Sequence, residues 1–209
     1  PKGIKSGKNT FNPALWDDPL HGYGYDCINE DALLRLASVK DGRIVLKDGV
    51  SYGLLVIPGR RRMQPEGELM NADVADDLVR LVKAGATVLI MQPALEDPGL
   101  KDMAGRDEAV KKDFQELLGG TFRKAGGQSG GWMMKTFGKG RVIRGPFNAS
   151  SLTGIGVAPD LTLDDAAGHH ASGMVWTHRV AGDSDIYFIS NQLDSAQILA
   201  ASFRAAGRI

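Results

Sequence analysis

One serine in this sequence lies in a pattern that can build a hydrolase nucleophile. Gly127-Gln128-Ser129-Gly130-Gly131 matches G-x-S-x-G, in which a sharp turn from a strand into a helix lifts the serine hydroxyl above a sheet. The flanking residues do not supply that turn, because Phe122 to Gly126 is not an apolar strand and no helix pattern begins at Trp132. We therefore interpret this segment as a glycine-rich loop and keep a serine hydrolase using Ser129 as an alternative hypothesis.

A basic loop is the second candidate for chemistry. Gly59-Arg60-Arg61-Arg62 follows an apolar run, and open α/β sheets bind ligands beyond the carboxyl ends of their strands. One hypothesis is therefore a stand-alone module that binds a sugar, a phosphate or a carboxylate in the loops around Gly59 to Arg62. The other is a solvated charge cluster that pairs with the acidic residues of Asp73 to Asp77.

The histidines, the cysteine and the acidic residues form no recognisable metal or redox motif. His169-His170 lack the spacing of zinc ligands, and Cys27, the one cysteine, cannot form an internal disulfide. Gly182-Asp183-Ser184-Asp185 lacks the later glutamate of a calcium loop and predicts a hairpin turn instead. Neither a dinucleotide-binding nor a P-loop glycine pattern occurs in the right context. We expect no metal, no cofactor and no catalytic residue in this chain.

The composition argues against two classes of partner. Lys and Arg number 25 and Asp and Glu number 25, so the chain lacks the basic surplus of a nucleic-acid binder. No run approaches the roughly 18 apolar residues of a membrane helix, and no apolar stretch of a signal peptide follows Pro1. We therefore expect a soluble protein with no nucleic-acid or membrane partner.

Apolar runs and helix-spaced patterns alternate in the middle of the chain. Short runs stopped by glycine or proline predict strands, and apolar residues three or four apart predict helices. The expected order is a helix capped by Asn29, strands at Arg43–Leu46 and Tyr52–Ile57, a helix whose apolar positions run from Leu69 to Val82, with Asn71 as a possible cap and Gly85 after its end, a strand at Ala86–Met91, a helix over Val110–Leu118 and a strand at Arg141–Ile143. This βαβ order predicts an α/β fold with an open parallel sheet, in which the continuous apolar strands are buried on both faces.

The pattern changes after Pro159. Met174 to Val180 and Asp185 to Ser190 predict an antiparallel hairpin, and a third strand-like run follows at Gln197–Phe203. We expect an extended leading segment at 1–25, an α/β domain at 26–160 and, at 172–209, a short antiparallel β segment that begins a β-sandwich-like domain. A βαβ layer followed by unfinished β structure indicates a piece of a longer protein.

Several of these segments, taken in order, resemble one family. They comprise Gly24 to Asn29, Ser38 to Leu46 with Asp48-Gly49 and Tyr52, Leu54 to Pro58, Met63-Gln64-Pro65, Leu81 to Val88, Gly138 to Val142, Gly156 to Asp160, Trp176 to Arg179, Gly182 to Asn191 and Phe203-Arg204. Together they are similar to a stretch of glycoside hydrolase family 106, the large α-L-rhamnosidases. The resemblance covers roughly residues 22 to 209.

The resemblance implies an accessory role. In that family a catalytic (β/α)₈ barrel precedes this stretch, and the stretch itself is flavodoxin-like, akin to class I glutamine amidotransferases. The catalytic carboxylates belong to the barrel, so none is carried over, and Cys27 lacks the G-x-C-x-G setting of an amidotransferase nucleophile. The implied function is a non-catalytic segment of a carbohydrate-degrading enzyme that packs on the barrel. An alternative is an assembly surface, as in some related β-galactosidases.

Five polar residues in the matched motifs are our candidates for substrate binding: Asp26, Asn29, His178, Arg179 and Asn191. For each, capping or hairpin formation is the alternative role, and Asn29 in particular is needed as a helix cap. For His178 we expect a hydrogen-bonded, partly buried ring on the strand face it shares with Met174, Trp176 and Val180. The implied partner is a rhamnose-containing glycan, and the implied location of the parent enzyme is periplasmic or extracellular.

Overall fold

The computed structural model describes residues 3–4, 16–17, 20, 22–47, 49–60, 66–124, 131–146 and 148–205. The chain forms two compact units. One, the α/β unit, is the continuous segment Ile28–Phe147. The other, the β unit, combines Pro1–Cys27 with Asn148–Ile209. Among the described residues, no helix has both the length and the apolar character needed to cross a membrane.

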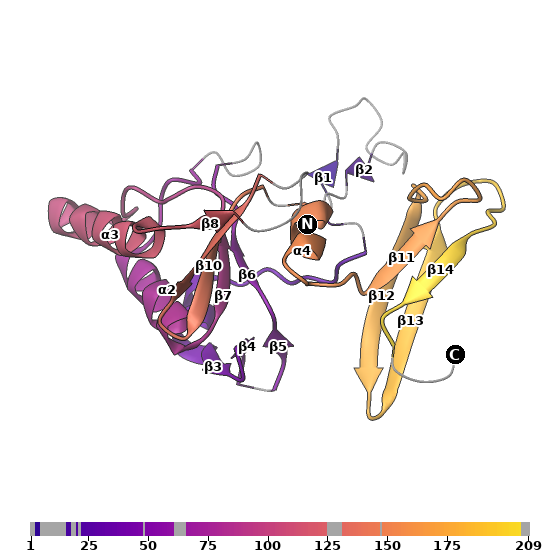
Figure 1. Cartoon of the computed structure of the whole chain (residues 1–209), viewed down its shortest axis with the longest axis horizontal. Helices are drawn as coiled ribbons and strands as arrows, with labels where there is room; N and C mark the ends of the chain where they lie inside the picture. Colours follow the sequence, from indigo (N-terminus) through magenta and orange to yellow (C-terminus); the bar gives the residue numbers. More distant parts are fainter. Residues whose placement is uncertain are drawn as a thin grey trace. The chain divides into compact units, whose positions relative to one another are not determined.

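A five-stranded mixed sheet is the centre of the α/β unit (Figure 1). Its order is β6 (Leu55–Ile57), β7 (Thr87–Ile90), β10 (Gly140–Arg144), β9 (Met133–Phe137) and β8 (Arg123–Lys124). The first three strands are parallel, with Leu55 and Val142 both paired to Val88 on β7. Every residue of β7 is buried, as a strand covered on both faces requires.

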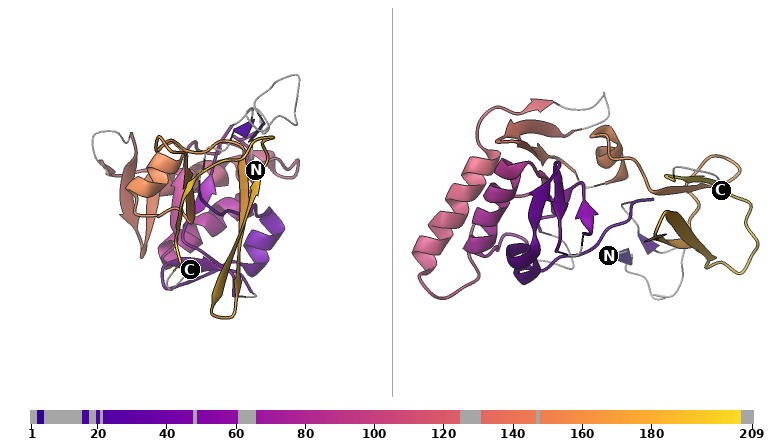
Figure 2. Two further views of the ribbon diagram at one scale, coloured as in Figure 1. Left: turned by 90° about the vertical axis from the view of Figure 1, so that its right-hand side faces the viewer. Right: turned by 90° about the horizontal axis from the view of Figure 1, so that it is seen from below.

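Two helices cover one face of this sheet and lie side by side (Figure 2). In α2 (Ala72–Ala84) the residues that recur on one side are buried, among them Leu78 and Val82, and the Asn71 side chain accepts a hydrogen bond from the Asp73 amide. Gly85, at φ 131°, ends the helix. In α3 (Met103–Leu118) Val110, Phe114 and Leu117 are buried. These helices confirm the spacing-based predictions.

A short helix and a small antiparallel sheet complete the α/β unit. Asn29 caps α1 (Glu30–Leu36), as predicted, and Leu33 is its buried residue. The sheet contains β3 (Ser38–Lys40), β4 (Arg43–Val45) and β5 (Ser51–Tyr52). Asp41 and Gly42 both have positive φ, 51° and 74°, as a type I′ hairpin turn requires. The predicted turn at Asp41-Gly42 is therefore confirmed.

Two predictions about strands were wrong. Tyr52 to Ile57 is not one strand, because the chain leaves the small sheet after Tyr52 and enters the central sheet at Leu55; β6 is an edge strand and is only half-buried. The central sheet is not purely parallel either. A two-residue turn at Gly138-Lys139 joins β9 to β10 as an antiparallel hairpin, and β9 was not predicted. The flavodoxin-like comparison stays a prediction.

The described residues of the β unit form short paired strands and a short helix. Its elements are β1 (Gly3–Ile4), β2 (Trp16–Asp17), α4 (Ala149–Gly154), β11 (Leu161–Asp164), β12 (Met174–Ala181), β13 (Ser184–Asn191) and β14 (Ala200–Phe203). In the described part of this unit, β1 pairs with β2, β11 with β14 and β12 with β13, each pair antiparallel. Leu161 and Leu163 are the centre of a small core that Trp176, Tyr187 and Phe203 cover.

The predicted hairpin is confirmed in β12 and β13. Ala181 pairs with Ser184 across Gly182-Asp183, and only Gly182 of the two turn residues has positive φ, which matches a type II′ turn. The third expected strand is shorter than 197–203 and pairs with β11, a strand that was not predicted.

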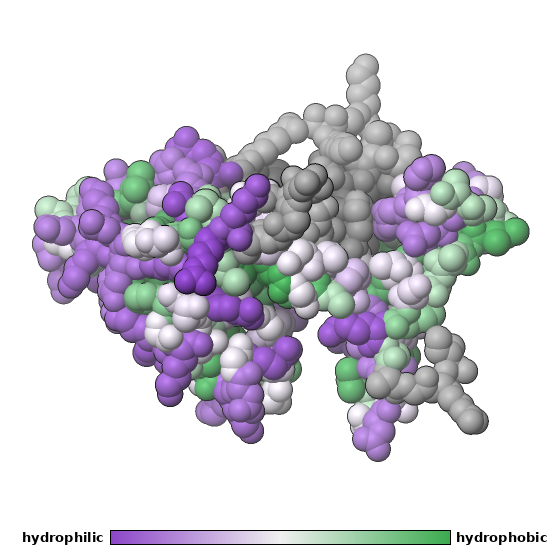
Figure 3. Space-filling view, in the orientation of Figure 1, coloured by the Kyte–Doolittle hydropathy of each residue, from purple (hydrophilic) through white to green (hydrophobic). Residues whose placement is uncertain are grey.

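The surface of the β unit carries apolar patches, which are green in Figure 3. Among its exposed apolar residues are Val180 and Phe188.

The boundary between the units differs from the expected domain end at residue 160. The α/β unit ends at Phe147, and residues 148–160 belong with the N-terminal segment. Tyr23 explains this grouping, because its hydroxyl lies 2.8 Å from Thr153 Oγ1 and donates to the Val157 carbonyl. Gly22 approaches Leu161 so closely that an added Cβ would lie 2.1 Å from the carbonyl oxygen. The β-sandwich-like completion of the β unit stays a prediction.

Candidate functional site

His178, one of the five residues predicted to bind substrate, belongs to a polar network inside the β unit. Its Nδ1 lies 2.9 Å from Asp160 Oδ2 and its Nε2 lies 2.8 Å from Asp185 Oδ1. The ring stacks on Tyr187, with 4.2 Å between centroids and 5° between planes. The expectation of a hydrogen-bonded, partly buried histidine is confirmed. Both ring nitrogens are occupied by carboxylates, so the ring offers no free polar edge to a ligand.

Asp160 is the centre of this network, and its side chain is only 8% exposed. Besides the His178 contact, it accepts hydrogen bonds from the Tyr187 hydroxyl at 3.0 Å and from Arg204 Nη2 at 3.1 Å. Burial, and then the bond to Asp160 and its charge, raise the pKa of Tyr187 to about 12. Tyr187 is therefore a neutral donor at physiological pH. The network joins the chain before β11 to the β12–β13 hairpin and to the end of β14.

Arg179 and Asn191 do not join His178. Arg179 is exposed and pairs with Ile186, so it lies on the opposite face of the hairpin because side chains alternate along a strand. Asn191 is the last residue of β13, where its side chain donates to the Ser195 carbonyl and accepts from the Leu193 amide. Both of these bonds stabilise a local turn, which is the alternative role we gave this residue.

Asn29 and Asp26 belong to different units. The Asn29 carboxamide oxygen accepts a hydrogen bond from the Ala32 amide at 2.8 Å, so the residue is the helix cap that the sequence requires. Asp26 is exposed in the β unit's N-terminal segment. The five predicted residues therefore do not form one cluster within either unit.

The two other sequence candidates lie partly or wholly outside the described residues. Ser129 falls in the gap at 125–130, so its predicted roles stay untested. Arg61 and Arg62 fall in the gap at 61–65. Arg60, at the start of that loop, forms an ion pair with Glu68, and its amide donates to Gln92.

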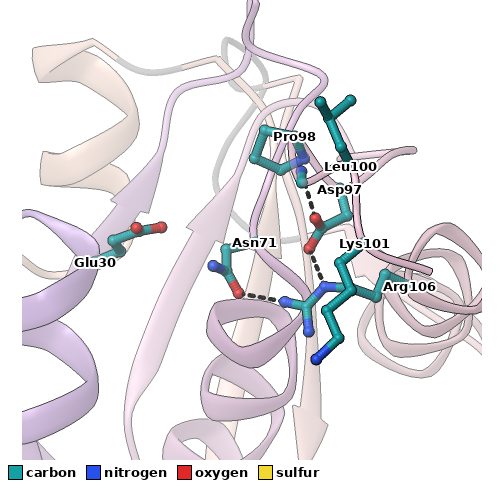
Figure 4. Close-up of a pocket in the computed structure, with 8 residues that line it drawn as sticks. Glu30, Asn71, Asp97, Pro98, Leu100, Lys101 and Arg106 are labelled. Carbon is teal, nitrogen blue, oxygen red and sulfur yellow. Dashed lines mark hydrogen bonds and ion pairs between the residues drawn. The ribbon is translucent and has the colours of Figure 1, made fainter. Parts of the chain in front are cut away.

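A pocket in the α/β unit lies at the carboxyl edge of the parallel strands, the edge where open α/β sheets bind ligands. It has a volume of about 390 Å³ and is open to solvent. The loop that follows β7 provides one wall, from Asp97 to Lys101. Asn71 at the cap of α2, Arg106 in α3 and Glu30 at the start of α1 provide the rest (Figure 4).

Asp97 holds this pocket together. Its carboxylate accepts hydrogen bonds from the Ala72 amide at the start of α2, from the Gly99 amide and from Arg106 Nε at 2.9 Å. Burial alone would raise the pKa of Asp97, but these three donors outweigh it and hold the pKa below its usual value. Arg106 also donates to Asn71 Oδ1, so one guanidinium links α3 to the cap of α2.

The residues on which both sites depend were not among the candidates predicted from the sequence. Asp160, Tyr187 and Arg204 all lie in the motifs that carry the family resemblance, and that was the available signal. For Asp97 and Arg106 the only signal was local, a turn-forming Asp-Pro-Gly and a cation near a helix start. Within the described ranges, no group of three or more His, Cys, Asp or Glu residues is arranged to hold a metal ion.

Comparisons with known proteins give consistent matches. The sequence model of the α-L-rhamnosidase family, glycoside hydrolase family 106, matches residues 9–209. A solved rhamnosidase from Novosphingobium sp. PP1Y is 26% identical, with a TM-score of 0.68, over 91% of this chain and 17% of that one. A putative beta-glucuronidase of Formosa agariphila is 26% identical over 187 residues, which are 90% of this chain and 13% of that protein. The chain thus spans less than a fifth of either relative.

Proposed function

Because the chain belongs to glycoside hydrolase family 106, the α-L-rhamnosidases, we propose that it is a non-catalytic accessory segment of a rhamnosidase-like enzyme. The observation that carries the proposal is the small share of each relative's length that this chain covers. The family match runs through nearly the whole chain, yet the chain corresponds to 17% of the solved rhamnosidase and 13% of the curated relative. The remainder of such a protein has ample length for a separate catalytic domain.

The carboxylates of the chain support the non-catalytic part of the proposal. Glycosidases cleave with two carboxyl groups that flank the sugar bond in a cleft. Among the described residues, the buried carboxylates are bound to other parts of the fold. Asp97 binds two amides and Arg106, Asp160 binds His178, Tyr187 and Arg204, and Asp77 binds Arg80. For Asp97 these donors hold the pKa of the carboxyl below its usual value, which makes it a poor general acid.

The proposed setting is a larger enzyme that acts on a rhamnose-containing glycan. In this setting the chain packs on a catalytic barrel that lies elsewhere in the polypeptide, and the parent enzyme is periplasmic or extracellular. The exposed apolar side chains of the β12–β13 hairpin, Ile186 and Phe188, are compatible with contacts to further parts of such a protein.

Hydrolysis of p-nitrophenyl α-L-rhamnoside tests the proposal. We expect turnover by the full-length parent and none by the 209-residue chain at matched molar concentration. In the full-length parent, Asp160→Asn should leave measurable turnover, because on this proposal the chain supports the barrel and supplies no catalytic group. Hydrolysis by the isolated chain would overturn the non-catalytic assignment, and an inactive native parent would overturn the rhamnosidase assignment.

A further inference from the structure

The pocket at the carboxyl edge of the α/β unit contains polar groups that the fold does not use. The Glu30 carboxylate and the Lys101 ammonium have no partner among the described residues, and they lie on opposite sides of the pocket in Figure 4. Arg106 is held through Nε and Nη2, which leaves Nη1 without a partner in the described part of the chain. The pocket therefore offers hydrogen-bond donors on one side and an acceptor on the other.

The charges of the lining residues indicate what kind of ligand fits. Glu30 and Asp97 are acidic, and Lys101 and Arg106 are basic, so their formal charges cancel. Arg106 is further neutralised by its ion pairs with Asp97 and Asp73. A phosphate or carboxylate ligand would gain little from such a site, because its charge would meet Glu30 as well as Lys101. A neutral ligand rich in hydroxyl groups fits better, since each hydroxyl both donates and accepts.

The wall that the loop after β7 provides carries apolar side chains beside its charged ones. Pro98 and Leu100 belong to the same loop as Lys101, and the Leu100 residue is 88% exposed, so its side chain extends into solvent beside the pocket. An apolar wall beside polar groups suits a sugar that carries a methyl group in place of one hydroxyl. The volume of about 390 Å³ falls in the range of small-ligand sites.

We propose that this pocket is a carbohydrate-binding site, separate from catalysis, for a 6-deoxyhexose residue of the substrate glycan. Its hydroxyls bind Glu30, Lys101 and Arg106, and its methyl group packs on Pro98 and Leu100. The identity of the sugar rests on the proposed function. Binding is weak, with a dissociation constant in the millimolar range, because the pocket is open and ordering the exposed Lys101 side chain costs conformational entropy.

Titration of the 209-residue chain with methyl α-L-rhamnoside, followed by amide NMR shifts, tests the site. We expect saturable shifts at Glu30, Asn71 and the 97–101 loop. Methyl α-L-mannoside, which differs by a hydroxyl on the methyl carbon, should bind more weakly. Inorganic phosphate and glucuronate should produce no saturable shift there. Absence of saturation with the rhamnoside, or tighter binding of phosphate, would overturn the proposal.

Variants at the pocket separate binding from folding. Glu30→Gln and Lys101→Gln change exposed side chains whose charged groups have no hydrogen-bond or ion-pair partner in the described part of the chain. Each should weaken rhamnoside binding about tenfold by removing a charged hydrogen-bond partner. Glu108→Gln and Lys111→Gln, exposed on α3 outside the pocket, are the matched controls and should bind like the native chain. Equal affinity in the pocket and control variants would contradict the site.

The parent enzyme distinguishes the two proposals. The native parent should turn over p-nitrophenyl α-L-rhamnoside whether or not the pocket binds sugar, because the proposed function assigns catalysis to a separate domain. Loss of sugar binding in the isolated chain with an active parent would overturn only the pocket. An inactive native parent with intact sugar binding by the chain would overturn only the rhamnosidase assignment.

Discussion

Asp160 accepts hydrogen bonds from three side chains that lie 18 to 44 positions after it, on β12, on β13 and just after β14. A buried carboxylate needs such partners, because transfer of an isolated charge out of water costs several kcal/mol. The same dependence makes the partners sensitive to its loss. His178 also contacts Asp185, whereas the carboxylate that Tyr187 and Arg204 contact among the described residues is that of Asp160.

Replacement of this acceptor should destabilise the β unit. We expect Asp160→Asn to lower the free energy of unfolding by about 3 kcal/mol, because the amide keeps the shape but removes the charge that Arg204 and His178 face. Urea denaturation followed by tryptophan fluorescence measures the change. Asp183→Asn, in the exposed hairpin turn, is the control and should lie within about 0.5 kcal/mol of the native protein. A similar loss in both variants would contradict the role of Asp160.

Tyr187 should make the free energy of unfolding fall at alkaline pH. Its pKa in the folded state is about 12, above the value near 10 of an unfolded chain, so the folded state keeps a proton that the unfolded state loses. Stability should therefore be unaffected by this group below pH 10 and should fall between pH 10 and 12. Denaturation measured across that range in the native protein and in Tyr187→Phe checks the sign, since the variant should show a smaller fall.

At the scale of elements, short helices depend on their caps. The helix α1 has seven residues, and a helix of that length is not stable without tertiary contacts and a satisfied first turn. Asn29 provides one of those bonds. The sequence alone left two roles open for Asn29, substrate binding and capping, and the structure supports capping.

Two substitutions of Asn29 separate these roles. Asn29→Ala should lower the free energy of unfolding by about 1 kcal/mol, and Asn29→Ser should recover most of it, because serine also caps helices. Thermal denaturation with circular dichroism measures both. In the parent enzyme the serine variant should retain the native KM for a rhamnoside; a raised KM at full stability would instead assign Asn29 to substrate binding.

The hairpin of β9 and β10 is pressed against the end of α2. Gly138 has φ 61°, and a Cβ there would lie 2.6 Å from the Lys83 Cα. Gly120 has a similar φ of 78° but has nothing within 4 Å of the same position. Replacement of either glycine by alanine should therefore cost a similar backbone strain energy, but only at Gly138 would the new Cβ collide with neighbouring atoms.

This pair isolates the packing of hairpin on helix. Gly120→Ala should cost about 1 kcal/mol, the usual penalty for a side chain in the left-handed region. Gly138→Ala should cost at least about 2 kcal/mol more, because the obstacle is helix backbone and cannot rotate away. Chemical denaturation of both variants gives the difference, and equal losses would show that the hairpin can move off the helix.

At the scale of the whole molecule, the two units differ in how the chain builds them. The α/β unit is continuous from Ile28 to Phe147 and contains its own core around Leu78, Val88 and Phe114. The β unit needs both ends of the chain, because the Asp160 and Leu161 amides donate to the Gly22 carbonyl.

Two fragments test this organisation. Residues 28–147 should fold alone and unfold cooperatively on heating, because their core is complete within the segment. Residues 148–209 should not, because they lack the segment that contains Gly22 and Tyr23. Circular dichroism and calorimetry report both outcomes. A cooperative transition in 148–209 would contradict the role of the N-terminal segment.

What the sequence determined was local. The spacing of apolar residues and the caps Asn29 and Asn71 predicted the helices α1, α2 and α3 of the α/β unit. Asp-Gly and Gly-Asp pairs predicted two hairpin turns. These signals act within a few residues. The collinear motifs likewise identified the family. The predicted strand at residues 52 to 57 was wrong, because an apolar run in a sequence does not show where the chain passes from one sheet to another.

Only the tertiary structure decided which residues meet. Tyr23 and Val157 are separated by 134 positions, and Asp160 and Arg204 by 44, so no local preference records their contacts. The same holds for the pocket, where Glu30 lies in α1, Asn71 caps α2 and Arg106 lies in α3. His178 shows the division most clearly. Its strand and its face followed from alternation along the sequence, but its two carboxylate partners depend on how the chain before β11 packs against the hairpin.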